Sequence, residues 1–138
     1  MSAADNEAVV RRWIEAYNER DTVGEEAGRT ADFVGHVPGL PPFDSAGWAQ
    51  FVWGFSTSFT DLHLTTESTV SEGDKVAARI TFRGTHNGDF MGLPPTGKQV
   101  TFSSMEINRM VDGKIAEHWV VLDMLSLLQQ LGVAPSPG

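Results

Sequence analysis

The spacing of the hydrophobic residues changes near residue 60, and this change restricts the possible fold more than any other feature. Before it, Val9, Trp13, Ile14 and Tyr17 recur at the three- and four-residue spacing of a helix. After it, apolar and polar residues alternate as they do in strands. Helices followed by consecutive strands predict an α+β domain, in which the helices pack on one face of an antiparallel sheet.

The expected elements follow from this spacing and from the turn residues between them. Predicted helices cover residues 5–20, 23–30, 45–58 and 124–131. Predicted strands cover residues 31–37, 62–71, 75–85, 99–111 and 114–122. Asp44 or Ser45 is the expected cap of the third helix, and Asp112-Gly113 has the composition of a tight hairpin turn. A strongly curved sheet over helices would enclose a conical cavity, where small ligands often bind.

Size and composition narrow the classes of protein. The 138 residues predict a single domain over residues 1–138, with residues 132–138 as a loose tail. A net charge of −8 without a basic cluster argues against a nucleic-acid partner. The absence of cysteine excludes disulfides and thiolate chemistry. No window resembles a membrane helix or a signal peptide, so we expect a cytoplasmic protein with no membrane partner.

Asp123 is the strongest catalytic candidate, because this carboxylate stands in an otherwise apolar run. Burial would raise its pKa toward neutrality, which suits a group that transfers protons. Equally, Asp123 could be the N-cap of the last helix, and the two roles are compatible. Along an ideal strand it shares a face with Trp119 and Val121, whereas His118 faces the other side.

The histidines give weaker signals. His36 could reach a pocket mouth as a hydrogen-bond donor or acid, or it could anchor its loop. We expect His86 to be structural and His63 to lie on the surface. No histidine pair has metal-ligand spacing, and no serine lies in a nucleophile elbow, so neither a metal site nor a Ser-His-Asp site is expected. Six aromatic residues are candidates for both core and pocket wall: Trp48, Phe51, Phe55, Phe59, Phe90 and Trp119.

Two segments resemble signatures of the SnoaL-like polyketide cyclases, within the nuclear transport factor 2-like superfamily. The first is GTHxGxFxGxxPTGK at residues 84–98, and the second is DGKIxEHWxxxD at residues 112–123. The resemblance implies a cone-shaped, curved antiparallel sheet wrapped around the N-terminal helices, a cystatin-like α+β barrel.

The resemblance also implies an activity. Characterised members include cyclases that close the last ring of aromatic polyketides by an intramolecular aldol condensation on a methyl ester, without a cofactor. The family's acid/base aspartate falls on Asp123, and its pocket histidines fall on His36 and His118. The expected ligand is a small apolar or polycyclic molecule, and the expected assembly is a homodimer or homotetramer formed through the outer sheet face.

Other functions on the same fold remain open. The protein could be a ketosteroid isomerase-like, dehydratase-like or epoxide hydrolase-like enzyme. An epoxide hydrolase would need a second carboxylate and an arginine in the pocket, and Glu106 and Arg109 lie near Asp123 in the predicted hairpin. Alternatively, it could be a non-catalytic binder of an apolar molecule. A pocket filled by its own side chains, or an Asp123 that faces water, would favour this last function.

Overall fold

The computed structural model describes residues 2–133 and has the predicted α+β architecture. Its helices are α1 (Ala3–Asn18), α2 (Thr22–Ala27), α3 (Ser45–Ser58) and α4 (Met124–Gln130). Its strands are β1 (Arg29–His36), β2 (His63–Glu72), β3 (Lys75–Thr85), β4 (Gln99–Val111) and β5 (Lys114–Leu122). The predicted second helix extended too far, because β1 already begins at Arg29. Residues 134–138 of the predicted tail lie outside the described residues.

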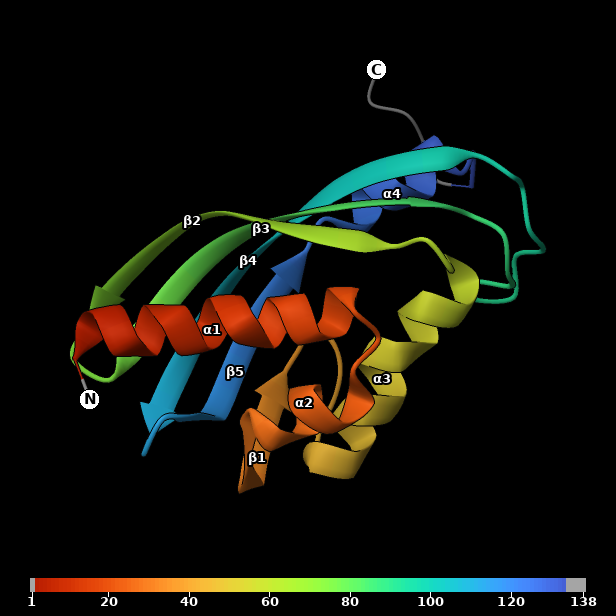
Figure 1. Ribbon diagram of the computed structural model, residues 1–138. Coiled ribbons are helices and arrows are strands. Elements are labelled where there is room, and N and C mark those ends of the chain that lie inside the picture. Colours follow the sequence, from red (N-terminus) through yellow and green to blue (C-terminus); the bar gives the residue numbers. More distant parts are fainter. Residues whose placement is uncertain (1, 134–138) are drawn as a thin grey trace.

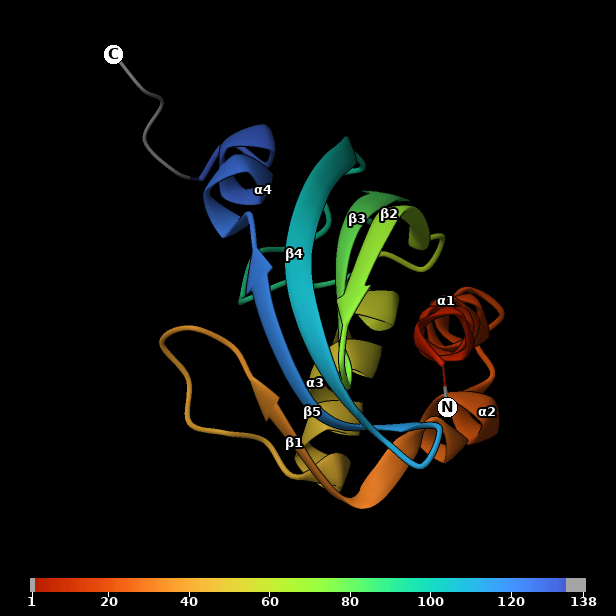
Figure 2. The ribbon, with the colours of Figure 1, turned by 90° about the vertical axis from the view of Figure 1, so that its left-hand side faces the viewer.

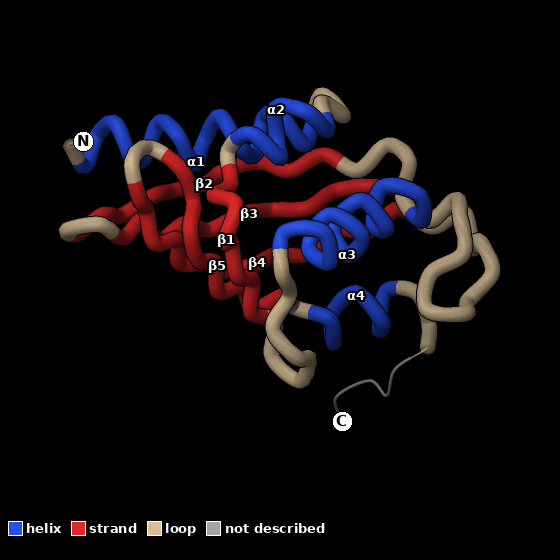
Figure 3. Tube along the Cα trace, turned by 90° about the horizontal axis from the view of Figure 1, so that it is seen from below, coloured by secondary structure: helices blue, strands red, loops and turns tan. Residues whose placement is uncertain are grey.

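The five strands form one curved sheet in the order β1-β5-β4-β3-β2 (Figure 1). The strands β2 to β5 make the predicted antiparallel meander, whereas β1 pairs with β5 in parallel. The helices α1 and α3 lie on the concave side of this sheet (Figure 2). There α1 contacts β2 and α3 contacts β1 (Figure 3). The helices therefore cover the concave face from two sides.

Local signals explain where these elements begin and turn. Ser2 and Asp5 form a reciprocal capping box at the start of α1. Asp44, rather than Ser45, caps α3, because its side chain accepts a hydrogen bond from the Gly47 backbone N–H. Asp112 and Gly113 both have positive φ, as the tight turn between β4 and β5 requires.

The core lies between α1 and the concave face of the sheet. Along one side of α1, Val10, Trp13, Ile14 and Tyr17 are buried. The fully buried side chains of the sheet include Ile80 and Ile115. Within residues 2–133, no helix is long and apolar enough to cross a membrane.

In the middle of β4 the usual distribution of polar and apolar residues is reversed. Ser104, Glu106 and Asn108 are buried on the concave face, whereas Met105 and Ile107 are exposed on the other. Strand β5 continues the pattern: His118 and Val120 are buried, and Val121 is exposed. Polar groups that are buried in this way need partners, so this part of the sheet is the first place to look for a functional site.

Candidate functional site

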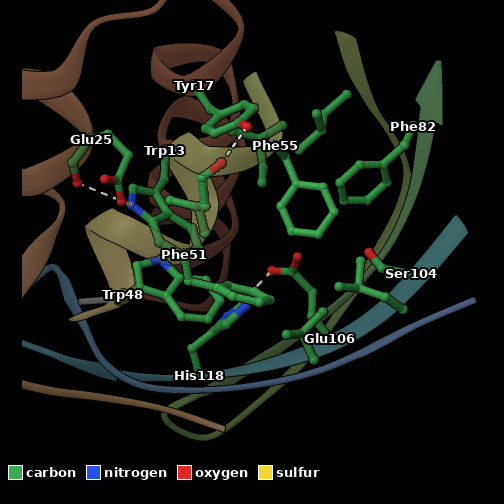
Figure 4. A pocket seen from close by; sticks show the side chains of 15 residues that line it. Trp13, Tyr17, Glu25, Trp48, Phe51, Phe55, Phe82, Ser104, Glu106 and His118 are labelled. Carbon is green, nitrogen blue, oxygen red and sulfur yellow. Dashed lines mark hydrogen bonds and ion pairs between the residues drawn. The ribbon is translucent and has the colours of Figure 1, made fainter. Parts of the chain in front are cut away.

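A cavity lies between the concave face of the sheet and the helices α1 and α3, with a free volume of about 70 Å³. Most of its wall is aromatic or aliphatic. The lining residues are Trp13, Ile14, Tyr17, Glu25, Trp48, Phe51, Val52, Phe55, Leu64, Phe82, Ser104, Glu106, His118, Val120 and Leu122. In Figure 4 the Glu106 side chain rises from β4 into this space, between Ser104 and His118.

Three buried polar side chains are connected by hydrogen bonds: Glu106 and His118 line the cavity, and Asn108 lies behind them. Asn108 lies directly across from His118 in the pairing of β4 with β5, and Glu106 is two residues away on the same face. The Asn108 Nδ2 group donates a hydrogen bond to Glu106 Oε2 at 2.7 Å. The Asn108 Oδ1 atom lies 2.6 Å from His118 Nδ1. Asn108 therefore joins the carboxyl group and the imidazole, which form no hydrogen bond with each other.

Burial shifts the pKa values of Glu106 and His118 in opposite directions, and in each case it favours the uncharged form. It raises the pKa of Glu106 to about 7, although the hydrogen bond from Asn108 opposes this rise. Burial also lowers the pKa of His118 to about 3, with a smaller contribution from the charge of His36. At neutral pH the imidazole is therefore uncharged, and the 3.9 Å contact between His118 Nδ1 and Glu106 Oε2 is not an ion pair. The cavity thus contains a carboxyl group that can both lose and gain a proton near pH 7.

Two tryptophans hold the His118 ring. The ring centroids of Trp13 and Trp48 lie 5.2 Å and 4.9 Å from it, both in edge-to-face geometry. Trp48 packs closely against β1 because residue 35 is glycine, where a Cβ atom would lie 2.6 Å from the Trp48 ring. His118 is therefore fixed by packing as well as by Asn108.

A buried ion pair anchors Trp13 from the other side. The Trp13 Nε1–H group donates to Glu25 Oε2 at 2.7 Å. Both Glu25 oxygens also accept from the Arg29 guanidinium, at 2.9 and 3.0 Å. Arg29 in turn donates to the Ser45 carbonyl and hydroxyl oxygens at 2.6 Å. Glu25 lines the cavity, but its carboxylate is already occupied by these partners.

Two polar atoms in the wall have no hydrogen-bond partner among the described residues: the Ser104 hydroxyl and the Trp48 indole nitrogen. Buried polar groups without a partner are rare, because desolvation is costly. In contrast, the Tyr17 hydroxyl donates to the Val52 carbonyl at 2.6 Å. Ser104 and Trp48 are therefore the donors that remain available to a ligand.

The structure corrects the expected environment of Asp123. This residue is exposed and does not line the cavity. Its Oδ1 atom accepts a hydrogen bond from the Ser126 backbone N–H at 3.1 Å, so it is the N-cap of α4. The apolar residues beside it in the sequence do not bury it, because the strand ends at Leu122 and the chain turns outward there. A catalytic role for Asp123 is still only a prediction.

His36 and Trp119 also lie outside the cavity, which corrects their expected places. They are neighbours in the pairing of β1 with β5, and their rings stack with centroids 5.4 Å apart. His36 Nε2 lies 2.6 Å from Glu117 Oε2, and Arg109 reaches the other Glu117 oxygen. The hydrogen bond with His36 holds the pKa of Glu117 below its usual range. These four residues form a cluster on the outer face of the sheet.

The other predicted residues divide between wall and core. Trp48, Phe51 and Phe55 line the cavity as expected. Phe59 and Phe90 do not; they pack against each other in the core, with ring centroids 5.3 Å apart. His63 is exposed.

His86 is buried in the loop region, where the Thr96 backbone N–H and hydroxyl group lie next to its Nδ1 atom. A structural role was expected for it. Within residues 2–133, no group of three or more His, Cys, Asp or Glu side chains could hold a metal ion.

Asn108 was not predicted as a site residue, and the direction of the Glu106 side chain was not predicted either. A signal was present, since the run Ser104-Met105-Glu106-Ile107-Asn108 alternates polar and apolar residues. Alternation alone does not say which set faces the core, and apolar residues are the usual choice. The reversed alternative becomes visible only when the helices are placed over the sheet.

Comparisons with known proteins agree with this fold. The family model of the SnoaL-like polyketide cyclases matches residues 7–131. The aklanonic acid methyl ester cyclase DauD of Streptomyces sp. (strain C5) is 31% identical over 131 residues, which cover 90% of this chain and 80% of that protein. The corresponding cyclase DnrD of Streptomyces peucetius is 30% identical, and the match covers 90% of this chain and 88% of DnrD.

Solved structures show the same likeness. AclR from Streptomyces galilaeus, provisionally described as a hydroxylase, superposes with a TM-score of 0.90 at 37% identity, covering 97% of this chain and all of AclR. IdmH from Streptomyces antibioticus, provisionally described as a polyketide cyclase, gives 0.84 at 34% identity, covering 93% of this chain and 99% of IdmH. The chain therefore belongs to the SnoaL-like polyketide cyclase family.

Proposed function

We propose that this protein is a cofactor-independent acid/base enzyme of the cyclase type, with Glu106 as its base. Its reaction would be the intramolecular aldol condensation of a polyketide-type ester. The observation that carries the proposal is a carboxyl group with a pKa of about 7 inside an apolar cavity. Relatives named as cyclases of aklanonic and nogalonic acid methyl esters support this choice of substrate class.

The proposed chemistry needs only a base that returns its proton. The Glu106 carboxylate removes a proton from a carbon that lies between a ketone and the ester. The resulting enolate carbon attacks a carbonyl carbon of the same molecule, so that one C–C bond forms and the carbonyl becomes an alkoxide. Glu106, now protonated, gives the proton to this alkoxide. A pKa near the working pH allows one group to perform both steps.

The wall contributes polar contacts for the charged intermediate. The enolate oxygen requires a hydrogen-bond donor, and the unpartnered Ser104 hydroxyl and Trp48 indole N–H groups fit this role. His36 was the expected donor, but it lies on the outer face. The aromatic wall excludes water and holds the flexible substrate in the geometry of attack, which can lower the barrier by several kcal/mol.

The cavity has to enlarge before a polycyclic ester can enter. Its free volume of about 70 Å³ is below the range of about 300–1,000 Å³ that is typical of ligand sites. The half-buried rings of Phe51, Phe55 and Phe82 line it and are less enclosed than the buried rings of Trp13, Tyr17 and Trp48. We therefore expect substrate binding to shift these rings.

Some features of the cavity fit two other functions, an epoxide hydrolase and a non-catalytic binder. Glu25 is a second carboxylate in the wall and Arg29 accompanies it, as an epoxide hydrolase would require, but both are occupied by each other. A small cavity and an exposed Asp123 are the features expected of a non-catalytic binder. The cyclase proposal is preferred because neither alternative uses the raised pKa of Glu106.

Turnover of the methyl esters of aklanonic and nogalonic acid tests the proposal. The product has the same mass as the substrate but a different absorption spectrum and retention time. We expect Glu106→Gln to lower kcat/KM by about 10²- to 10⁴-fold, as loss of a general base does. Asp123→Asn is the matched control, because asparagine caps a helix about as well as aspartate. It should change kcat/KM by less than about threefold.

The reverse result would overturn the choice of base: a large loss in Asp123→Asn with an active Glu106→Gln would restore Asp123 as the catalytic residue. Binding of both esters without turnover by the wild type would instead favour the non-catalytic binder. A product heavier by one oxygen would point to a hydroxylase, the activity provisionally given to AclR.

We also propose that a second copy of the chain covers the outer face of the sheet. Val70, Met105, Ile107 and Val121 are exposed there, around a groove of about 410 Å³. Contiguous exposed apolar surface of this kind is typical of protein interfaces. A cytoplasmic location stays a prediction from the sequence.

A further inference from the structure

Asn108 is fully buried and contacts three groups, which together determine its orientation. Its Nδ2 atom lies 2.7 Å from Glu106 Oε2 and 3.4 Å from the Val76 carbonyl oxygen. A backbone carbonyl oxygen can only accept a hydrogen bond, so the Asn108 nitrogen is the atom that faces it. The Asn108 oxygen must then face His118 Nδ1, at 2.6 Å.

This orientation determines the state of the imidazole. An amide oxygen can only accept, so His118 Nδ1 has to carry a proton. The low pKa of His118 keeps the ring uncharged at neutral pH, so Nε2 carries none. Among the described residues, no group forms a hydrogen bond with Nε2.

We infer that Asn108 is a positioning residue, which holds His118 in the Nδ1–H tautomer and so presents Nε2 as a hydrogen-bond acceptor to the ligand. The tautomer does not depend on the proposed function. Only the contact between Nε2 and a ligand rests on it, because that contact requires a substrate in the cavity. The inference names a feature of that substrate: a hydroxyl group, phenolic or enolic, close to the carbon that Glu106 deprotonates. A methyl ether at the same position could not donate to Nε2 and would be rejected, because it leaves a buried acceptor unpaired.

His86 provides a contrast within the same molecule. The Thr96 backbone N–H group donates to His86 Nδ1 at 3.2 Å. A backbone N–H can only donate, so this Nδ1 atom carries no proton and the neutral ring has its proton on Nε2. The two buried histidines are therefore expected to be opposite tautomers.

Long-range ¹H–¹⁵N spectra of the uniformly ¹⁵N-labelled, full-length protein at pH 7 test this directly. We expect His118 to show a protonated Nδ1 and an unprotonated Nε2, and His86 to show the reverse. His118→Gln and His86→Gln assign the signals. A wild-type His118 with its proton on Nε2, or a charged ring, would overturn the inference.

Substitution of Asn108 separates its two hydrogen bonds. Asn108→Ala removes both, so His118 should lose its preference for Nδ1–H while the His86 pattern stays unchanged and reports an intact fold. Asn108→Asp keeps an acceptor opposite His118 Nδ1 and, as a carboxylate, cannot donate to Glu106, so above pH 7 it should retain the Nδ1–H proton. An unchanged His118 pattern in Asn108→Ala would contradict the positioning role.

Turnover gives a second, separate readout. We expect Asn108→Ala to lower kcat/KM by about 10- to 100-fold through loss of orientation. In a plot of kcat/KM against pH, the midpoint on the acid side should lie at higher pH for Asn108→Ala than for the wild type. The reason is that this variant lacks the hydrogen bond that lowers the pKa of Glu106. The other titratable groups in the wall are Tyr17 and Glu25, and Arg29 pairs with Glu25; these are the same in all variants. The same midpoint in both proteins would contradict the hydrogen bond between Asn108 and Glu106.

The spectra are recorded without substrate, so they determine the tautomer of His118 even if the cyclase proposal is wrong. Conversely, turnover by a protein whose His118 is protonated on Nε2 would overturn the inference and leave the cyclase proposal intact.

Discussion

The two faces of β4 and β5 differ in a way that reverses the usual rule for a sheet. The concave face buries Glu106, Asn108 and His118 under the helices. The outer face exposes Met105 and Val121, which are 61% and 58% accessible. A sequence selected for stability alone would place these residues the other way round, since buried polar groups cost free energy and exposed apolar groups contribute none.

This reversal is the feature that the two proposals above share, a small ligand on the concave face and a second copy of the chain on the outer face. The concave face offers a titratable carboxyl group and unpaired donors to a small ligand. The outer face offers apolar surface to another protein surface. The same two-residue repeat therefore places polar side chains on one side of the sheet and apolar side chains on the other.

The largest expected effect is on the free energy of unfolding, when the ion pair on each face is broken. Arg29→Met leaves Glu25 buried without its partner, and we expect this to lower the free energy of unfolding by about 3–5 kcal/mol. Arg109→Met on the outer face removes a half-exposed partner of Glu117 and should cost less than about 1 kcal/mol. Urea denaturation of both variants checks the comparison. Equal losses would show that the concave face is as hydrated as the outer one.

The next effect is the pH dependence of stability at Glu106. Folding raises its pKa from 4.5 to about 7, so the folded state favours the protonated form. The stability that this contributes is present below pH 4.5 and is lost as pH rises through 7. Glu106→Gln cannot ionise, so at pH 8.5 it should be more stable than the wild type by about 3 kcal/mol. Near pH 4 the two proteins should be similar.

Glu117→Gln is the matched control on the outer face. Folding lowers the pKa of Glu117, mainly through its hydrogen bond with His36, so the sign is opposite. This variant should not gain stability at pH 8.5. Urea titrations at pH 4 and pH 8.5 decide both cases, and a Glu106→Gln variant less stable than the wild type at pH 8.5 would exclude a destabilising buried carboxylate.

The smallest effect on the folded monomer is expected at the apolar outer face. Met105 and Val121 are paired across β4 and β5. The double variant Met105→Lys with Val121→Lys should change monomer stability by less than about 1 kcal/mol, because both side chains are exposed. It should nevertheless convert a dimer into a monomer in sedimentation velocity. Glu19→Lys, at the exposed C-cap of α1, changes the net charge by the same amount and should leave the assembly intact. A monomeric wild type would refute the proposed interface.

Local residue patterns allowed much of the fold to be predicted. The two-residue repeat predicted β2 and β3, and Asp112-Gly113 predicted the hairpin of β4 and β5, because these features depend on neighbouring residues. The same repeat correctly placed His118 and Trp119 on opposite faces of β5. The motif resemblance supplied the family, which the comparisons confirm.

The residue pattern therefore specifies the set of elements and which residues share a face. Which face the helices cover depends on packing in three dimensions, because alternation defines two sets of side chains and does not indicate which set is buried. Packing of α1 and α3 against the concave side selected Glu106 and His118 for the cavity. It left Trp119 outside, and the end of β5 before Asp123 made that carboxylate a helix cap at the surface.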